Sequence, residues 1–283
     1  MKLKSTSLVL SGMILAATAV YAQVATPEQS NLAQQRSSTF AVTSEKQFDN
    51  LVHQYILKNP EVVIEAFEAY KAKQLKQAEQ EQANMLEHVA NYYPQEAKNL
   101  LETGIRIGEA NQSNIMVEFM DPLCGYCKKI STELDQLTDT QLVLKPLALF
   151  AQSDSSLGKP SLALAAAYKQ FGAKNPKAFK ECYKAIMTAD YQQGNIQNKL
   201  DEIQQQYKQY GADFSEQSLK AYQADLDQNM KHFQALKFRG TPAMIIHPAN
   251  DYAKAIAIPG YVPVQNIQAM ITEKFAKNAN KVS

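Results

Sequence analysis

Residues 115–127 of this chain read IMVEFMDPLCGYC. Its first six residues, 115–120, are apolar except for one glutamate, which predicts a buried strand. The pattern over residues 122–137 predicts a helix, and the apolar run 142–147 predicts a second strand. A strand, a helix and a strand in this order form a βαβ unit. Its most economical arrangement is a parallel strand pair with a right-handed crossover.

The two cysteines of Cys124-Gly125-Tyr126-Cys127 lie where the first strand passes into the helix. Unpaired N–H groups and the helix dipole stabilise an anion at a helix N-terminus, so the pKa of Cys124 should fall and its thiolate should be favoured. Cys127 follows one turn deeper, within reach of a mixed disulfide formed at Cys124. The motif therefore predicts a redox-active pair, with Cys124 as the nucleophile and Cys127 as the resolving thiol.

Other uses of a C-x-x-C motif fit this chain less well. A zinc site needs a second Cys or His pair, but Cys182 is alone and no two of the four histidines are closely spaced. Covalent haem attachment needs a His after the second Cys, where this chain has Lys128. A structural disulfide is a further alternative, although so short a ring constrains little. We expect no metal or other bound cofactor, and we expect Cys182 to be a buried, unpaired thiol.

The charge balance and the first residues indicate the class of protein and its location in the cell. The 283 residues carry 29 Lys and Arg against 28 Asp and Glu, which excludes strong non-specific binding to nucleic acid or anionic lipid. A basic start, the uncharged run 5–20 and the small residues of Val20-Tyr21-Ala22 predict a cleaved secretory signal peptide over residues 1–22. An uncleaved membrane anchor is the alternative, but the run is short for a span. We expect a soluble, periplasmic protein.

The segment before the βαβ unit is predicted to be mostly helical. Residues 23–42 lack periodicity and should form a disordered leader. Residues 43–90 should form a helical oligomerisation and spacer region, with a break at Asn59-Pro60 and an almost wholly polar stretch, KAKQLKQAEQEQ, over residues 71–82. Short helices with uncovered apolar faces need a partner, which predicts a homo-oligomer. The apolar positions are Phe48, Leu51, Val52, Tyr55, Ile56, Val62, Val63, Phe67 and Tyr70.

The rest of the chain completes an α/β pattern. Residues 157–238 are helical in character throughout. Residues 243–247 predict a return to strand, residues 256–259 a short partner strand, and residues 263–277 a closing helix.

This order of elements, with Gly240-Thr241-Pro242-Ala243 before a late strand, resembles the DsbA family of thioredoxin-fold proteins over roughly residues 105–276. Residues 48–73, with Lys58-Asn59-Pro60-Glu61-Val62, resemble the amino-terminal extension of its ScsC-like branch. The resemblance implies an α/β thioredoxin fold with a large helical insertion in a domain over residues 104–283. It also implies an amino-terminal helical extension that makes the protein a homo-oligomer.

The same resemblance implies roles for five further residues. Glu118, six residues before Cys124, matches a buried acid that handles the proton of the resolving thiol, although a partly exposed strand residue is the alternative. Pro242 matches a cis-proline that faces the two cysteines, and Thr241 matches the residue whose backbone pairs with an extended substrate. Gly125 and Tyr126 belong to the same substrate-binding surface, and this pair lacks the His of strongly oxidising members.

We therefore expect an exported thiol–disulfide oxidoreductase that acts on unfolded or wrongly disulfide-bonded proteins, together with a membrane redox partner. The disulfide itself would carry the electrons. Thr241 favours an isomerase or reductase, because within the family a Thr before the cis-proline accompanies isomerases and ScsC-like proteins. A DsbA-like oxidase is the first alternative. A non-catalytic envelope binding protein and a copper- or zinc-binding module are the others.

Overall fold

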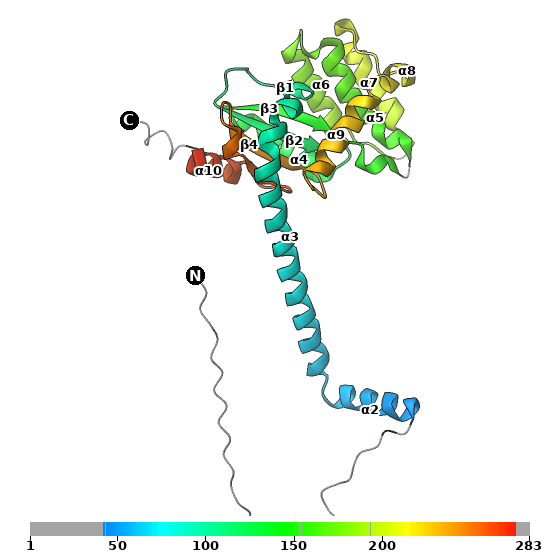
Figure 1. Cartoon of the computed structure of the whole chain (residues 1–283). Coiled ribbons are helices and arrows are strands. Elements are labelled where there is room, and N and C mark those ends of the chain that lie inside the picture. The colour runs from blue at the N-terminus through cyan, green and yellow to red at the C-terminus, as the bar shows by residue number, and fades with distance from the viewer. Residues whose placement is uncertain (1–41, 43, 153, 193, 276–283) are drawn as a thin grey trace, which may run out of the picture. The chain divides into compact units, whose positions relative to one another are not determined.

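The computed structural model describes residues 42, 44–152, 154–192 and 194–275, drawn in colour in Figure 1. The chain forms two compact units that divide after Tyr70. The predicted signal peptide lies outside the described residues, and so does the predicted leader apart from Val42. In the described part of the chain, none of the helices combines the length and the apolar character needed to cross a membrane.

The first unit contains α2 (Glu45–Lys58) and the start of α3 (Glu61–Glu102). Ser44 caps α2, because its hydroxyl accepts a hydrogen bond from the backbone N–H of Gln47 at 3.3 Å. The chain leaves the helical conformation at Asn59, so the break predicted at Asn59-Pro60 is confirmed.

Apolar side chains of these helices lie on the surface. In α2, all of whose residues the structure describes, no residue is buried. Phe67 and Tyr70 of α3 are each more than 60% exposed. The other large exposed apolar residues of this unit are Val42, Phe48, Val52, Tyr55, Ile56, Leu57, Val63 and Ile64. So much apolar surface in a short segment is typical of an interface between proteins.

A mixed sheet forms the centre of the second unit (Figure 1). Its strands are β1 (Ile105–Ile107), β2 (Asn114–Met120), β3 (Thr140–Pro146), β4 (Ala243–Pro248) and β5 (Ile256–Ile258), in the order β1-β3-β2-β4-β5. Strands β2 and β3 are parallel, as predicted, and every other neighbouring pair is antiparallel. The sequence did not predict β1 as a separate strand.

Helices cover both faces of this sheet. On one face, α4 (Gly125–Glu133) and α10 (Val264–Phe275) pack on Met116 and Met120 of β2. On the other face, the end of α3 and the helix α9 (Gln223–Ala235) pack on Val117 and Phe119. Successive side chains of a strand point to opposite faces, so Glu118 shares the α4 face with the two methionines.

We predicted that the thioredoxin-fold domain begins at residue 104. The end of α3, which precedes that residue, also belongs to this core. The helix continues through Pro94, although proline cannot donate the usual backbone hydrogen bond. Tyr93, Ala97 and Leu100 are fully buried against the sheet, and this packing holds the helix together through the proline. The polar stretch 71–82 therefore belongs to one continuous helix, α3, and the carboxyl-terminal part of α3 is a layer of the second unit.

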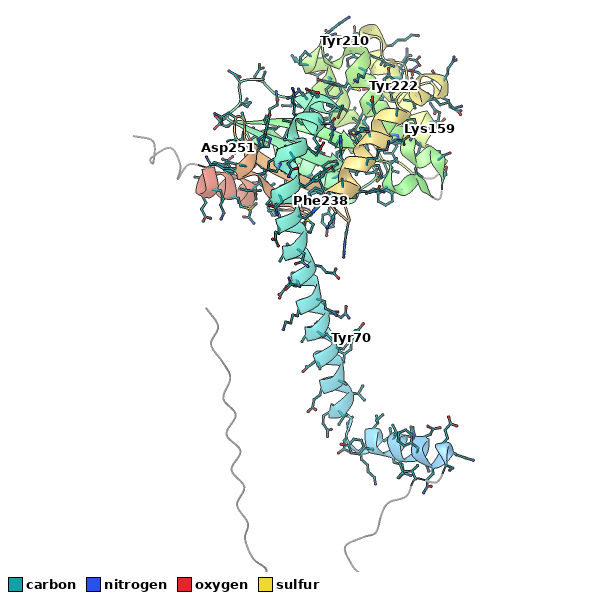
Figure 2. The ribbon with its side chains drawn as sticks, in the orientation of Figure 1. Tyr70, Lys159, Tyr210, Tyr222, Phe238 and Asp251 are labelled. Atoms are coloured by element: carbon teal, nitrogen blue, oxygen red, sulfur yellow. The ribbon has the colours of Figure 1, made fainter. Side chains whose placement is uncertain are left out.

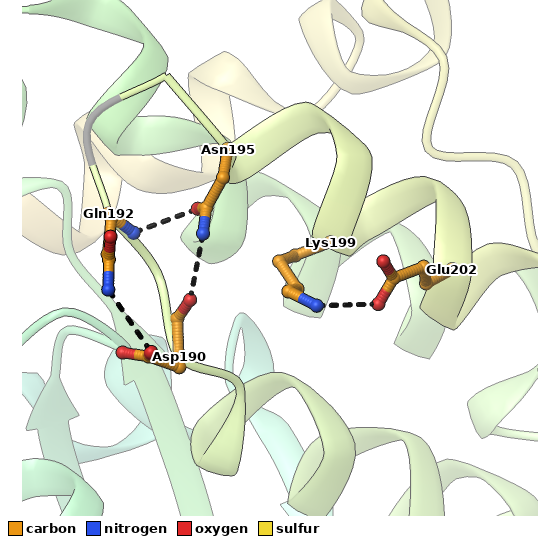
Figure 3. A network of polar contacts seen from close by, with 5 residues as sticks. All are labelled: Asp190, Gln192, Asn195, Lys199 and Glu202. Atoms are coloured by element: carbon orange, nitrogen blue, oxygen red, sulfur yellow. Dashed lines mark hydrogen bonds and ion pairs between the residues drawn. The ribbon is translucent and has the colours of Figure 1, made fainter.

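The predicted helical insertion lies between β3 and β4. One polar loop in it is held by Asn195, whose amide accepts from the backbone N–H of Gln192 at 2.8 Å and donates to the carbonyl of Asp190 at 3.2 Å (Figure 3). Beyond it, Lys199 pairs with Glu202 at 2.9 Å within α7 (Figure 3). The α-helices of the insertion before α9 are α5 (Lys159–Ala167), α6 (Pro176–Thr188), α7 (Ile196–Tyr207) and α8 (Glu216–Lys220). The shorter helical segments of the second unit are η1 (Leu134–Gln136), η2 (Leu149–Gln152), η3 (Ser155–Gly158), η4 (Tyr168–Gly172), η5 (Lys208–Tyr210) and η6 (Tyr252–Lys254).

The exposed face of the first unit predicts self-association that two charges should abolish. Replacing Phe48 and Phe67 together with Asp should give a monomer, because an unpaired carboxylate is strongly disfavoured inside an apolar contact. Sedimentation of the mature chain measures this. The control replaces two exposed polar residues, Gln54 and Gln74, with Asp and should keep the assembly. A monomeric wild type, or an unchanged assembly in the Phe48 and Phe67 variant, would contradict the prediction.

Candidate active site

The turn between β2 and α4 is held by Asp121. Its carboxylate accepts from the backbone N–H of Leu123 at 2.9 Å and from that of Leu149, after β3, at 2.8 Å. Its backbone carbonyl accepts from the N–H of Cys124 at 2.9 Å. Burial raises the pKa of Asp121 to about 6, and the hydrogen bonds oppose that rise. No sequence motif marked Asp121 for this holding role.

Cys124 is the N-cap of α4, as the sequence predicted. Its residue is 9% exposed, whereas Cys127 is fully buried beneath it. The Cys124 sulfur lies 3.2 Å from the backbone carbonyl oxygen of Thr241, to which its thiol donates a hydrogen bond when it is protonated. The peptide bond between Thr241 and Pro242 is cis, as the resemblance implied. Four of the predicted site residues therefore meet at one point, from segments that are far apart in sequence.

The surroundings shift the pKa values of the two thiols in opposite directions. A hydrogen bond from the Cys127 side chain is the main cause that lowers the pKa of Cys124 to about 5. Thr241 and the backbone N–H groups at the start of α4 add to this effect, and partial burial opposes it. For Cys127, the same hydrogen bond, burial and the charge of Glu118 all raise the pKa. Near neutral pH, Cys124 is the thiolate and Cys127 is the thiol.

Glu118 lies fully buried on the α4 face of the sheet, so the alternative of a partly exposed strand residue is wrong. It sits between Leu144 of β3 and Met244 of β4 in the strand register. Among the described residues, neither carboxylate oxygen has a hydrogen-bond partner. Burial, and secondarily the charge of Cys124, raise the pKa of Glu118 to about 8. A carboxyl group in this state can take up or release a proton near neutral pH.

Two aromatic groups flank the exposed side of the site: Tyr126, which the sequence singled out, and Tyr261, which it did not. Tyr126 is 61% exposed and stacks on Tyr261, with ring centroids 5.5 Å apart. The ammonium group of Lys129 lies 4.4 Å from the centre of the Tyr261 ring. Glu133 fixes this loop, because it accepts from the Tyr261 hydroxyl at 2.8 Å and from the Val264 backbone N–H at 3.2 Å. Gly125 adds open space, since a Cβ there would meet nothing within 4 Å.

Lys128 and Cys182 lie away from this chemistry. The ammonium group of Lys128 donates to the carbonyl of Ala189 and lies 5.2 Å from the ring of Tyr191, so it ties α4 to the insertion. Cys182 is fully buried, and burial raises its pKa to about 12. Within the described ranges, no cluster of three or more His, Cys, Asp or Glu residues could hold a metal ion.

Comparison with known families identifies the class of this fold and site. Residues 100–253, more than half of the chain, match the thioredoxin family model, so the chain belongs to the thioredoxin family. Residues 45–78 match the model described as the copper resistance protein ScsC N-terminal domain. The chain therefore combines a thioredoxin-family domain with an amino-terminal segment that is similar to the N-terminal domain of ScsC.

Solved structures show the same fold. Proteus mirabilis ScsC in a transitional conformation is 24% identical, with 85% of this chain and 99% of that chain covered and a TM-score of 0.50. A linker-deletion mutant of that protein, which carries one further substitution, is 22% identical, with the same coverage and a TM-score of 0.51. BcfH of Salmonella enterica Typhimurium is 17% identical, with 87% and 98% covered and a TM-score of 0.52. A comparison with curated proteins finds no match.

The pKa difference between the thiols predicts selective alkylation of the reduced protein. Cys124 should react fast at every pH above about 5, because its thiolate is already formed there. Cys127 should stay unreactive through neutral pH. Mass spectrometry of peptides alkylated from pH 4 to pH 9 measures both. Faster labelling of Cys127, or titration of Cys124 near the free-cysteine value of about 8.5, would overturn the assignment.

The raised pKa of Glu118 predicts a pH-dependent contribution to stability. The folded protein holds this proton more tightly than the unfolded chain, so the contribution is complete below the unfolded value of about 4.5 and is lost as pH rises through about 8. Glu118→Gln replaces the titrating carboxyl group with an amide, so the variant does not lose this stability as pH rises. In urea unfolding under reducing conditions, the variant should gain stability relative to wild type from pH 5 to pH 8, by on the order of a few kcal/mol.

An exposed carboxylate serves as the control for that comparison. Glu109→Gln should keep the wild-type pH slope, because Glu109 lies on the surface. Any contribution of Cys124 to the slope is present in all three proteins. If Glu118→Gln and the wild type show parallel profiles, Glu118 does not hold a proton in the folded protein at neutral pH.

Proposed function

We propose that this chain is an exported protein thiol–disulfide oxidoreductase that works as a disulfide isomerase or reductase on folding proteins. Membership of the thioredoxin family supports a redox role. The observation that carries the proposal is the Cys124 sulfur, with its lowered pKa, beside the carbonyl of Thr241 and above the buried Cys127. Residue Cys124 is 9% exposed and Cys127 is fully buried, so a client sulfur would approach the pair at Cys124.

The first chemical step is attack by the Cys124 thiolate on one sulfur of a client disulfide. A bond forms between Cys124 and the client, the client disulfide breaks, and the second client sulfur leaves as a thiolate. The backbone of Thr241 would hold the client segment in an extended conformation during this step. Pro242 would fix the loop, and Gly125 and Tyr126 would contact the client around its cysteine.

The mixed disulfide can then resolve in two ways. In isomerisation, another client thiolate attacks the client sulfur of the mixed disulfide, Cys124 leaves as a thiolate, and no net electrons move. In reduction, Cys127 gives its proton to ionised Glu118 and attacks Cys124. The client then leaves as a thiolate, and Cys124 and Cys127 form a disulfide. A pKa of about 8 lets Glu118 act in either direction near neutral pH.

The exposed apolar face of the first unit favours isomerisation. An oligomer built through Phe48, Phe67 and their neighbours would present several catalytic units to one client. A client released by one Cys124 would meet another at high effective concentration, which suits repeated attack on wrong disulfides. A membrane redox partner would keep Cys124 and Cys127 reduced in the periplasm.

One observation favours the second candidate, a DsbA-like oxidase. A pKa of about 5 for Cys124 means that its thiolate is stabilised, and with it the reduced form of the pair. A stabilised reduced form makes the disulfide a stronger oxidant of client thiols. The two candidates use the same residues and differ in the direction of electron flow.

Refolding of scrambled ribonuclease separates these functions. The full mature chain should restore activity, and the Phe48→Asp, Phe67→Asp double variant should do so about tenfold more slowly, because it loses the avidity of the assembly. Thr241→Val should also be slower, since it removes a group that lowers the pKa of Cys124. The Gln54→Asp, Gln74→Asp variant serves as the control. If the full chain restores nothing and the monomeric variant rapidly oxidises a reduced substrate, the oxidase replaces the isomerase.

A further inference from the structure

A groove of about 400 Å³ lies on the second unit beside the Thr241–Pro242 loop. One wall is a face of α3, and the opposite wall is the segment between α9 and β4, together with Pro259, which directly follows β5. We call it the linker groove. It is separate from the cysteine pair, and none of the roles assigned above uses it.

The α3 wall comes from the end of the polar stretch 71–82 and the residues that follow it. Asn84 and four further residues of α3 line the groove, and these four are Ala78, Glu81, Gln82 and Met85. They are spaced as i, i+3, i+4 and i+7, which is one face of a helix. This stretch therefore has a definite inner side, with Ala78 and Met85 as apolar contacts and Gln82 as an amide that can pair with a peptide group.

The opposite wall is held in place by the end of α9. The backbone N–H of Lys237 bonds to the carbonyl of Gln234 at 2.9 Å, and that of Phe238 bonds to Phe233 at 3.2 Å. This pattern closes a helix with one left-handed residue, and here Lys237 takes that role with a φ of 59°. The ring of Phe238 packs on Phe233, with centroids 6.0 Å apart, and anchors the segment (Phe238 is labelled in Figure 2).

The groove wall adjoins the candidate active site in sequence. Gly240 lines it, and the next residue, Thr241, accepts the hydrogen bond from Cys124. A Cβ on Gly240 would meet nothing within 4 Å, so a polypeptide backbone can approach this position closely. A chain that runs past Thr241 in an extended conformation therefore has an open path between Gly240 and the face of α3.

We propose that the linker groove binds the part of a client polypeptide that flanks the cysteine held at Cys124, so that α3 forms one side of the client-binding surface. The proposal rests on the function proposed above. The groove suits an extended segment with small or medium apolar side chains against Ala78, Met85 and Phe238.

The charges of the groove argue against a strongly charged client. Glu81 and Arg239, one from each wall, form an ion pair at 2.6 Å. Their side chains are 56% and 80% exposed, so the pair adds little to stability. It does neutralise both charges, and it leaves Lys237 as the remaining charged residue of the lining. Binding should therefore depend on apolar contact and backbone pairing more than on salt.

A bulky residue placed in the groove tests this proposal. Ala78→Trp fills the groove from the α3 side, and Ala83→Trp places the same side chain on an exposed position of α3 outside the lining. Each protein is assayed with scrambled ribonuclease and with a small aromatic disulfide that is too short to reach the groove. We expect Ala78→Trp to lower the ratio of the two kcat/KM values by about fivefold or more, mainly through KM for ribonuclease. We expect Ala83→Trp to keep the wild-type ratio.

The outcomes distinguish the groove from the proposed function. If the wild type exchanges the small disulfide and the ribonuclease but Ala78→Trp keeps the wild-type ratio, the groove proposal fails and the oxidoreductase stands. If the wild type exchanges neither, both proposals fall. If Ala78→Trp changes the sedimentation of the mature chain, the groove is occupied by a second copy of this chain, which also overturns the proposal.

Discussion

The contact between the Cys124 sulfur and the Thr241 carbonyl is the constraint on which the site depends. It joins positions 117 residues apart, and the whole helical insertion lies between them. Asp121 holds one side of this contact by tying the start of α4 to the segment after β3. The helix end at Lys237 and the register of β4 against β2 hold the other side. The sheet core thus serves to keep two short loops at hydrogen-bonding distance.

Burial of ionisable groups is the means by which this fold sets reactivity. Glu118 faces α4 without a hydrogen-bond partner among the described residues, and its proton affinity rises accordingly. On the opposite face, Lys145 is also fully buried, donates to the Thr103 hydroxyl at 2.6 Å, and has its pKa lowered by burial to about 7. Each group destabilises the core when charged. The sheet therefore carries an acid and a base that both titrate near neutral pH, one on each face.

Local patterns made the cysteine pair and most elements predictable. The strand before Cys124, the parallel partner and the break at Asn59 follow from apolar runs, spacing and a proline. The cis bond at Pro242 and the role of Thr241 came only from resemblance, because nothing local marks a loop that meets a residue so far away in sequence. The continuation of α3 past Pro94 was missed since tertiary packing of Tyr93 and Leu100 outweighs the lost hydrogen bond. Tyr261 and Glu133 carry no motif, so only the assembled fold brings them to the site.

Because α3 is one continuous helix, the number of residues in its polar stretch is constrained, although the composition of that stretch suggests no such constraint. The stretch KAKQLKQAEQEQ is almost wholly polar and contains no recognisable motif, and its positions face solvent. Yet the same helix runs unbroken into Val89 and Tyr93, which are fixed in the core. Each residue added between Met85 and Val89 would turn Ala78 and Gln82 about the helix axis by about 100°. Such an insertion would leave the charge and helix propensity of the stretch almost unchanged, yet it would move a different face towards Arg239. Substitutions should therefore accumulate here far more readily than insertions or deletions.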